Sequence, residues 1–182
     1  AFEVALLALV AGGALVAIAA RRIRSRPRVL RAWPPTVTLL ASCALFALAS
    51  QVPCSSGCPV PYGPLFTWQD FTHTTAAVFA FAGASWAMLQ CSFAVGRRML
   101  RRFSLLAAIS VAVIAGAGGL MSLLRFHADV GSRFEFVATT IGIAWIAVLG
   151  LTLAVERSAA HRAEQLLGAA DERGDLRVVA VD

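Results

Sequence analysis

The chain has 182 residues, of which 59% are hydrophobic and 14% are charged, and its formal net charge is +6 at pH 7. A soluble domain has about 25% charged residues, so this composition excludes an ordinary soluble protein and predicts an integral membrane protein. The positive charge comes from arginine alone and lies beside apolar stretches, where it sets topology and attracts lipid head groups. It therefore gives no indication of nucleic-acid binding. The frequent Ala, Val and Arg residues are typical of a GC-rich bacterial genome, such as that of an actinobacterium.

Apolar stretches of membrane-spanning length follow one another along the chain. A hydrocarbon core about 30 Å thick needs roughly 20 apolar residues in a helix. We therefore expect an all-α, polytopic transmembrane helix bundle over residues 1–155, followed by a cytoplasmic helical extension and tail over residues 156–182. The second span begins at a Pro-Pro pair, which suits a first helical turn. The five predicted spans are 2–20, 34–52, 70–95, 104–124 and 133–155.

The arginines alternate between the connections, and this alternation predicts the orientation of the bundle. Ten of the sixteen arginines lie in the connections 21–31 and 97–102. Short arginine-rich loops mark the cytoplasmic side of a membrane protein, so we expect these connections and the C-terminus to lie in the cytoplasm of a bacterial inner membrane. The loop Cys54–Trp68, the turn 125–132 and the N-terminus are then outside. Five spans with an outside N-terminus predict a further helix upstream.

Apart from Glu3, the ionisable side chains near the predicted outer face form one group. Asp70 and His73 are three residues apart, so they share one face of a helix, and Asp70 can also cap that helix. Polar residues at such depth usually face the bundle interior and mark a functional site or an ion-pair network. The members of this outer cluster are Asp70, His73, Arg125, His127, Asp129, Arg133 and Glu135.

Three interpretations of the outer cluster compete: an ion-pair network, a pocket for a substrate or lipid head group, and a catalytic centre. Two histidines with Asp70 and Asp129 could supply four metal ligands and activate a water, but their spacing is not diagnostic. His161 lies on the predicted cytoplasmic side, so the third histidine of ceramidase-type amidases is missing. We favour a non-catalytic role, and we predict no catalytic residue, metal or cofactor. The network would consist of Asp70, Arg125, Arg133 and Glu135.

The chain has four cysteines, in two different environments. Cys54 and Cys58 lie in the predicted outer loop, on the oxidising side, where a pair of thiols normally forms a disulfide. The loop that this disulfide closes is short, so its stabilisation is at the low end of about 2–4 kcal/mol. A redox-active pair is the alternative. Cys43 and Cys91 lie inside spans and are interpreted as small apolar packing residues.

Three sequence features together resemble one known family. They are the outer loop Cys54-Ser-Ser-Gly-Cys58-Pro59, the Asp70-Phe-Thr-His73 opening of a span, and Gly131-Ser-Arg133-Phe-Glu135 before a span with Trp145 in its middle. In these features, over most of residues 21–153, the chain resembles a family of bacterial membrane proteins known as domain of unknown function 998. The resemblance implies six spans and no particular reaction. The chain departs from the family at Ser132-Arg133, where a Glu-Arg pair is usual.

These observations favour a non-catalytic membrane subunit or accessory protein of a larger assembly that handles lipids or envelope components. The expected partners are membrane lipids and other membrane protein subunits. The alternative is an intramembrane enzyme that acts on a lipid or quinone with Asp70, His73 and His127 at its centre. A transporter is disfavoured because the middle of the predicted membrane region holds no ionisable residue, whereas transporters usually bind their substrates near the midplane.

Overall fold

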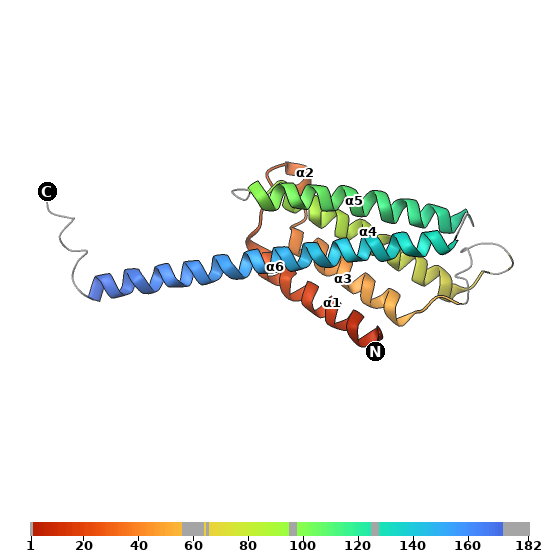
Figure 1. Cartoon of the computed structure of the whole chain (residues 1–182), viewed down its shortest axis with the longest axis horizontal. Helices are drawn as coiled ribbons and strands as arrows, with labels where there is room; N and C mark the ends of the chain where they lie inside the picture. The colour runs from red at the N-terminus through yellow and green to blue at the C-terminus, as the bar shows by residue number, and fades with distance from the viewer. Residues whose placement is uncertain (1, 56–63, 65, 95–97, 125–127, 173–182) are drawn as a thin grey trace.

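The computed structural model describes the whole chain except residues 1, 56–63, 65, 95–97, 125–127 and 173–182. The described residues form helices and no β-strand, apart from one isolated bridge between Ser25 and Ala94. Figure 1 shows the helices α1 (Phe2–Ala19), α2 (Arg28–Arg31), α3 (Pro35–Gln51), α4 (Trp68–Ser92), α5 (Arg98–Leu123) and α6 (Ala128–Glu172), and a short 3₁₀ turn, Ala20–Arg22, continues α1.

Three described helices are long and apolar enough to cross a membrane: α4, the segment Arg98–Ser122 of α5, and the segment Arg133–Ala170 of α6. The prediction of an all-α membrane helix bundle is therefore confirmed. With 17 residues, α3 is a shorter apolar helix, about 26 Å long at roughly 1.5 Å per residue. That α1 and α3 also cross the bilayer stays a prediction.

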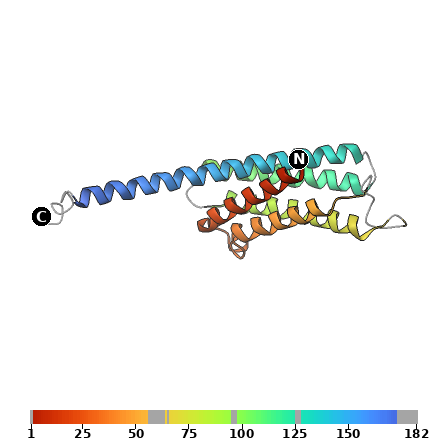
Figure 2. The same ribbon diagram turned by 90° about the horizontal axis from the view of Figure 1, so that it is seen from below.

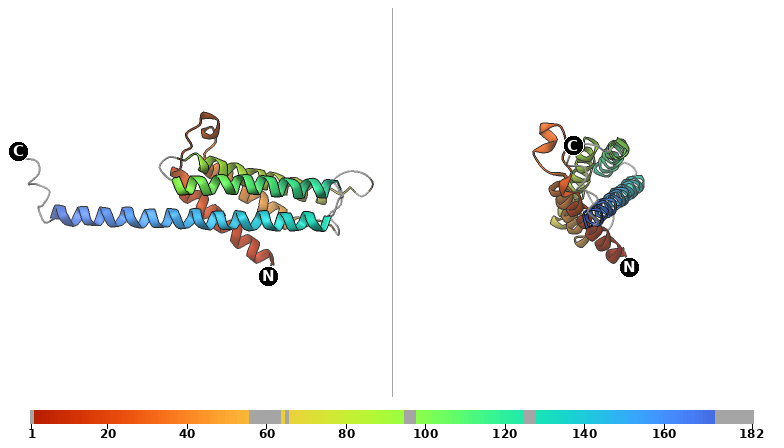
Figure 3. Two further views of the ribbon diagram at one scale, coloured as in Figure 1. Left: turned by 45° about the horizontal axis from the view of Figure 1, so that its top comes forward. Right: turned by 90° about the vertical axis from the view of Figure 1, so that its left-hand side faces the viewer.

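The helices pack against their neighbours in the sequence. Helix α3 contacts α1 and α4, and α5 contacts α4 and α6. Helix α1 also crosses α6 obliquely, as the two views of Figure 3 show, so that the first and last helices close the bundle. The segments 21–31 and 98–102 lie at one end of the bundle, from which α6 projects (Figure 1), and we call it the arginine-rich end. The opposite end, where α4 begins, is the His73 end.

Close contacts between helices depend on small residues at particular positions. A Cβ atom added at Gly118 of α5 would lie 3.0 Å from Cβ of Phe134 and 3.1 Å from the carbonyl oxygen of Gly131, both on α6. A Cβ at Gly83 would lie 3.3 Å from Cβ of Ser42, so α3 and α4 are almost as close. The Ser42 hydroxyl donates a hydrogen bond of 2.7 Å to the carbonyl of Ala80 across this contact. Small residues thus permit tight packing at these two interfaces.

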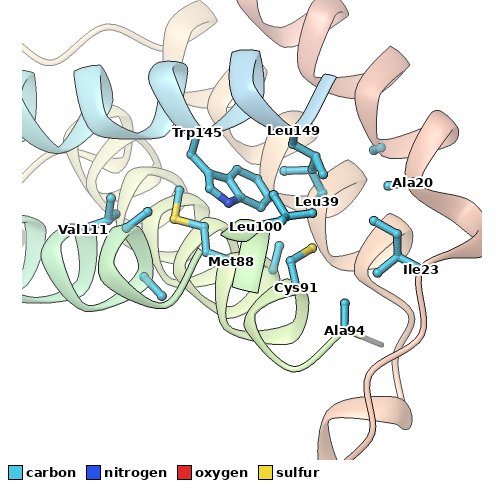
Figure 4. Packing of buried hydrophobic residues seen from close by; sticks show 14 of the residues in the cluster. Ala20, Ile23, Leu39, Met88, Cys91, Ala94, Leu100, Val111, Trp145 and Leu149 are labelled. Carbon is cyan, nitrogen blue, oxygen red and sulfur yellow. The ribbon is translucent and has the colours of Figure 1, made fainter. Parts of the chain in front are cut away.

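The core lies in the half of the bundle near the arginine-rich end. Figure 4 shows Trp145 of α6 packed among Met88, Leu39 and Leu149. The indole nitrogen of Trp145 donates a hydrogen bond of 2.9 Å to the Ser104 hydroxyl on α5, and both residues are fully buried. This polar contact joins α5 to α6 inside an otherwise apolar cluster. Cys43 and Cys91 are also buried in that cluster, as the packing interpretation predicted.

The segment between α1 and α3 is attached to the end of α4. The Ser25 hydroxyl donates to the backbone carbonyl of Gln90 at 2.8 Å. The side-chain amide of Gln90 donates to the carbonyl of Leu30 at 3.0 Å and also to that of Trp33. Gln90 is fully buried, so this one side chain holds the end of α2 and the residues after it against the bundle. The arginine-rich connection is therefore ordered by a residue on a different helix.

Helix α6 continues far beyond the other helices. Figures 1 and 2 show it projecting from the arginine-rich end as a single straight helix. Residues 154–169 of this helix are all exposed. We call this segment the α6 extension.

Candidate functional site

A groove of about 680 Å³ runs along the bundle between α4 and α5, and we call it the α4–α5 groove. Its walls are mostly aliphatic and aromatic, and it opens toward the surface that would face lipid. Trp86 and Ile109 on its walls are 40% and 54% exposed. The residues that line it are His73, Thr74, Ala77, Val78, Phe81, Ala82, Ser85, Trp86 and Leu89 of α4, Ala108, Ile109, Ala112, Ala115, Gly116, Gly119, Leu120 and Ser122 of α5, and Glu135 of α6.

The groove exists because α5 presents small residues toward α4 over most of its length. A Cβ atom added at Gly116 or Gly119 would meet no other atom within 4 Å. Gly118, between them in sequence, faces α6 and is tightly packed. The glycines of this run therefore do two different things: one lets α5 approach α6, and two leave open space beside α4. The small residues of α5 thus leave a gap beside α4 and permit tight packing against α6.

The polar residues of the groove gather at the His73 end. His73 and Thr74 lie in the second turn of α4, Ser122 lies near the end of α5, and Glu135 lies in the second or third turn of α6. His73 of α4 and Glu135 of α6 thus line the same end of the groove. Toward the arginine-rich end the lining is apolar except for Ser85. The groove is therefore amphipathic along its length, with a polar mouth and a long apolar body.

The ring of His73 is held by the end of α3. Its Nδ1 lies 2.9 Å from the carbonyl oxygen of Ala49 and 2.8 Å from that of Val52. Carbonyl oxygens only accept hydrogen bonds, so Nδ1 carries a proton. In the neutral ring Nε2 is then an acceptor. The contact satisfies carbonyls at the C-terminus of α3, which have no partner within their own helix, and it fixes the ring at the groove mouth.

Ser85 is the one polar residue deep in the groove. Its hydroxyl oxygen is buried and has no hydrogen-bond partner among the described residues. A buried polar group without a partner costs about 1–3 kcal/mol. The groove wall therefore contains a hydroxyl that an occupant could satisfy.

Asp70 has a structural role at the start of α4. Its carboxylate accepts hydrogen bonds from the Ser55 amide at 2.7 Å and the Ser55 hydroxyl at 2.9 Å, and from the Thr67 hydroxyl at 2.5 Å. The Thr67 hydroxyl in turn accepts from the Asp70 amide at 3.1 Å, which caps the helix. Asp70 is fully buried by these contacts and does not line the α4–α5 groove. The sequence placed Asp70 correctly at the start of this helix, where it joins the cap that Thr67 makes.

The other members of the predicted outer cluster divide into two groups. Arg125 and His127 lie outside the described residues, and at Asp129 only the helical backbone is described. Arg133 is exposed on α6 and is not in the groove lining, whereas Glu135 is. Among the described residues, no three His, Cys, Asp or Glu side chains come close enough to hold a metal ion. The described partners of Asp70 are hydroxyl and amide groups, so the ion-pair network stays a prediction.

Of the two cysteines in the predicted disulfide, the structure describes one. Cys54 is described and Cys58 lies outside the described residues, so the Cys54–Cys58 bond stays a prediction. The segment that begins at Cys54 is nevertheless attached to the bundle, because Ser55 binds the carboxylate of Asp70.

His73 and Glu135 could be identified from the sequence, but the groove that joins them could not. The sequence feature that relates to the groove is the run of small residues on α5 that ends in Gly116, Gly118 and Gly119. Spacing alone did not show which of these glycines would face a neighbouring helix and which would face open space.

Comparison with protein-family models, with curated proteins and with solved structures finds no match to this chain. The resemblance to domain of unknown function 998 therefore stays a prediction, and a function can be proposed only from the geometry of the groove and of the residues at its mouth.

Proposed function

We propose that this chain is a non-catalytic integral membrane protein that holds a long-chain lipid in the α4–α5 groove, as an accessory subunit of a lipid-handling assembly. The observation that supports this proposal is the groove itself. Its volume of about 680 Å³ falls within the range of about 300–1,000 Å³ that is usual for ligand sites. Its apolar body would hold a hydrocarbon chain, and its polar mouth would hold a head group.

The length of the groove supports a chain rather than a compact ligand. His73 and Leu89 are 16 residues apart on α4, which corresponds to about 24 Å along a helix axis. This is most of the roughly 30 Å thickness of a hydrocarbon core. A chain that entered at the mouth would lie along the helices, with its far end beside Trp86 and Leu89.

Two contacts favour a non-catalytic role over the alternative of an enzyme centred on Asp70, His73 and His127. The carboxylate of Asp70 is used by Ser55 and Thr67. One nitrogen of His73 is used by the end of α3. A general acid or base must reach the reacting group of its substrate, and Asp70 does not line the groove.

The orientation that we propose places the arginine-rich end in the cytoplasm of a bacterial inner membrane, following the positive-inside rule. The groove mouth and the segment after Cys54 would then face outward. An impermeant maleimide tests this orientation in a background in which Cys54 and Cys58 are replaced by serine. Gln69→Cys should react in intact cells and Ser158→Cys, on the α6 extension, only after lysis; the reverse pattern would contradict the orientation.

Native mass spectrometry of the purified protein tests lipid binding. The wild-type protein should carry a bound lipid, and Gly116→Leu should lose it, because the new side chain fills the groove without meeting another atom at its Cβ. The matched control is Gly12→Leu on α1, where a Cβ also meets nothing within 4 Å but which lies outside the groove. Equal lipid occupancy in wild type and Gly116→Leu would contradict the proposal.

Purification from the native membrane tests the accessory role. A subunit of an assembly should bring down stoichiometric partner subunits in mild detergent. Recovery of the protein only as a lipid-loaded monomer would leave lipid binding in place and contradict the assembly.

A further inference from the structure

We infer that the lipid in the α4–α5 groove carries a head group that donates hydrogen bonds, a hydroxyl or an amine, and not an anionic head group. This inference rests on the proposed lipid binding and narrows its ligand class. The atoms that line the groove mouth support it.

His73 presents an acceptor to the mouth. Two backbone carbonyls fix the proton on Nδ1, so the neutral ring has an unshared pair on Nε2. The ring lines the groove, and a hydroxyl or ammonium group at the mouth would be the natural partner of that nitrogen. The ionised oxygens of a phosphate or sulfate only accept hydrogen bonds, so they would be repelled by the unshared pair on Nε2 of His73.

Glu135 reinforces this preference. It lines the mouth from α6, and an ionised carboxylate only accepts hydrogen bonds. Arg133 is two residues away and therefore about 200° around the helix at roughly 3.6 residues per turn, and it is not in the groove lining. The groove lining in the described part of the chain contains no arginine at all. An anionic head group would thus lie beside the Glu135 carboxylate, and no arginine of the described groove lining would neutralise its charge.

The length of the groove fits a long chain behind that head group. The small residues Ala112, Gly116 and Gly119 line one wall along the length of α5. The far end is marked by Trp86, which gives a spectroscopic probe of how deep the chain reaches. A head group at His73 places the chain end near Trp86, about 20 Å further along α4 over 13 residues.

Quenching of tryptophan fluorescence by chains that end in bromine tests this inference. The protein would carry Trp33→Phe and Trp68→Phe, which leaves Trp86 in the groove and Trp145 fully buried in the core. The probes are 18-bromo-octadecanol, 18-bromo-octadecylamine and 18-bromo-octadecyl sulfate, added to the protein in nanodiscs of uncharged lipid. The alcohol and the amine should quench Trp86 at concentrations at least tenfold lower than the sulfate.

Variants of α6 separate the head-group inference from lipid binding as such. Glu135→Gln should weaken binding of the amine about tenfold while the alcohol changes little, and Arg133→Gln on the other side of the helix should leave the order of the probes unchanged. Equal or tighter binding of the sulfate would overturn the inference and leave lipid binding intact. No quenching by any probe, with Gly116→Leu identical to the parent, would overturn lipid binding itself.

Discussion

Asp70 is a residue whose chemistry looks catalytic and whose contacts are structural. Its carboxylate joins three parts of one end of the bundle: the segment at Ser55, the residue Thr67 before α4, and α4 itself. Each bond is charge-assisted when Asp70 is ionised, and such bonds are roughly twice as strong as neutral ones. Asp70 therefore organises the entrance side of the groove without lining it.

We expect Asp70→Asn to lower the melting temperature in detergent by several degrees, because an amide can accept at only one of its two polar atoms. Circular dichroism during heating would measure this change. Thr72→Val is the matched control on the same helix, since its hydroxyl binds only the carbonyl of Trp68 and is solvent-accessible. A loss in Asp70→Asn no larger than that in Thr72→Val would refute the structural role of Asp70.

Gln90 has the corresponding role at the arginine-rich end. We expect Gln90→Met, which keeps the size of the side chain, to detach the segment between Ser25 and Trp33, because that segment loses its bonds to the amide. The expected destabilisation is about 1–3 kcal/mol, since carbonyls lose their donor in a buried place. Trypsin should then cleave after the arginines of this segment several times faster than in wild type. Gln51→Met, at the exposed end of α3, is the control.

If both glutamine variants are cleaved at the wild-type rate, the attachment of this segment through Gln90 is incorrect. The sequence indicated that this connection was basic and short. It could not show that the connection is bound by α4, because the partner lies 60 residues away in the sequence.

At the scale of elements, α5 is a helix with two different faces made by neighbouring glycines. Gly118 meets α6 at contact distance, and Gly116 faces the groove. We expect Gly118→Ala to destabilise the protein by about 1–3 kcal/mol, as overpacking of a well-packed contact does. Gly116→Ala should be neutral or stabilising by up to about 1 kcal/mol, because alanine is the better helix former. Unfolding by a titration with a denaturing detergent measures both.

This pair is a test on one helix, with the same substitution made two residues apart. Equal stability of the two variants would mean that α5 is not packed against α6 in this way. The distribution of glycines along the sequence predicted close helix packing in general. Which face is packed and which is open depends on the rotation of α5, and that rotation is set by its neighbours α4 and α6.

The sequence predicted most of the architecture because hydrophobic length and arginine position are local signals. The observed helices begin and end within a few residues of the predicted spans, except at two starts. Helices α5 and α6 begin at Arg98 and Ala128, about six and five residues earlier than predicted, and α6 continues to Glu172, where a helical extension was expected. The contacts of the outer cluster were harder to predict from the sequence. Asp70 and His73 were correctly placed at one helix end, but their partners come from other elements.

On the scale of the whole molecule, the groove lies directly beside the core, and Ala108 belongs to both. The buried cluster around Trp145 joins α1, α3, α4, α5 and α6 near the arginine-rich end. The groove lies on the side of α4 and α5 that would face lipid. A bundle with an open groove on its surface can hold a chain without separating its helices, which suits a binding protein.

The central claim is that a lipid chain occupies the α4–α5 groove, and photo-crosslinking tests it most directly. A long-chain alcohol with a diazirine near its chain end would be added to the protein in nanodiscs, irradiated, and its attachment sites mapped by peptide mass spectrometry. We predict labelling concentrated around Trp86 and Ile109, and its loss in Gly116→Leu but not in Gly12→Leu. Labelling spread evenly over exposed apolar residues such as Leu15 and Leu151, and unchanged in Gly116→Leu, would contradict the claim.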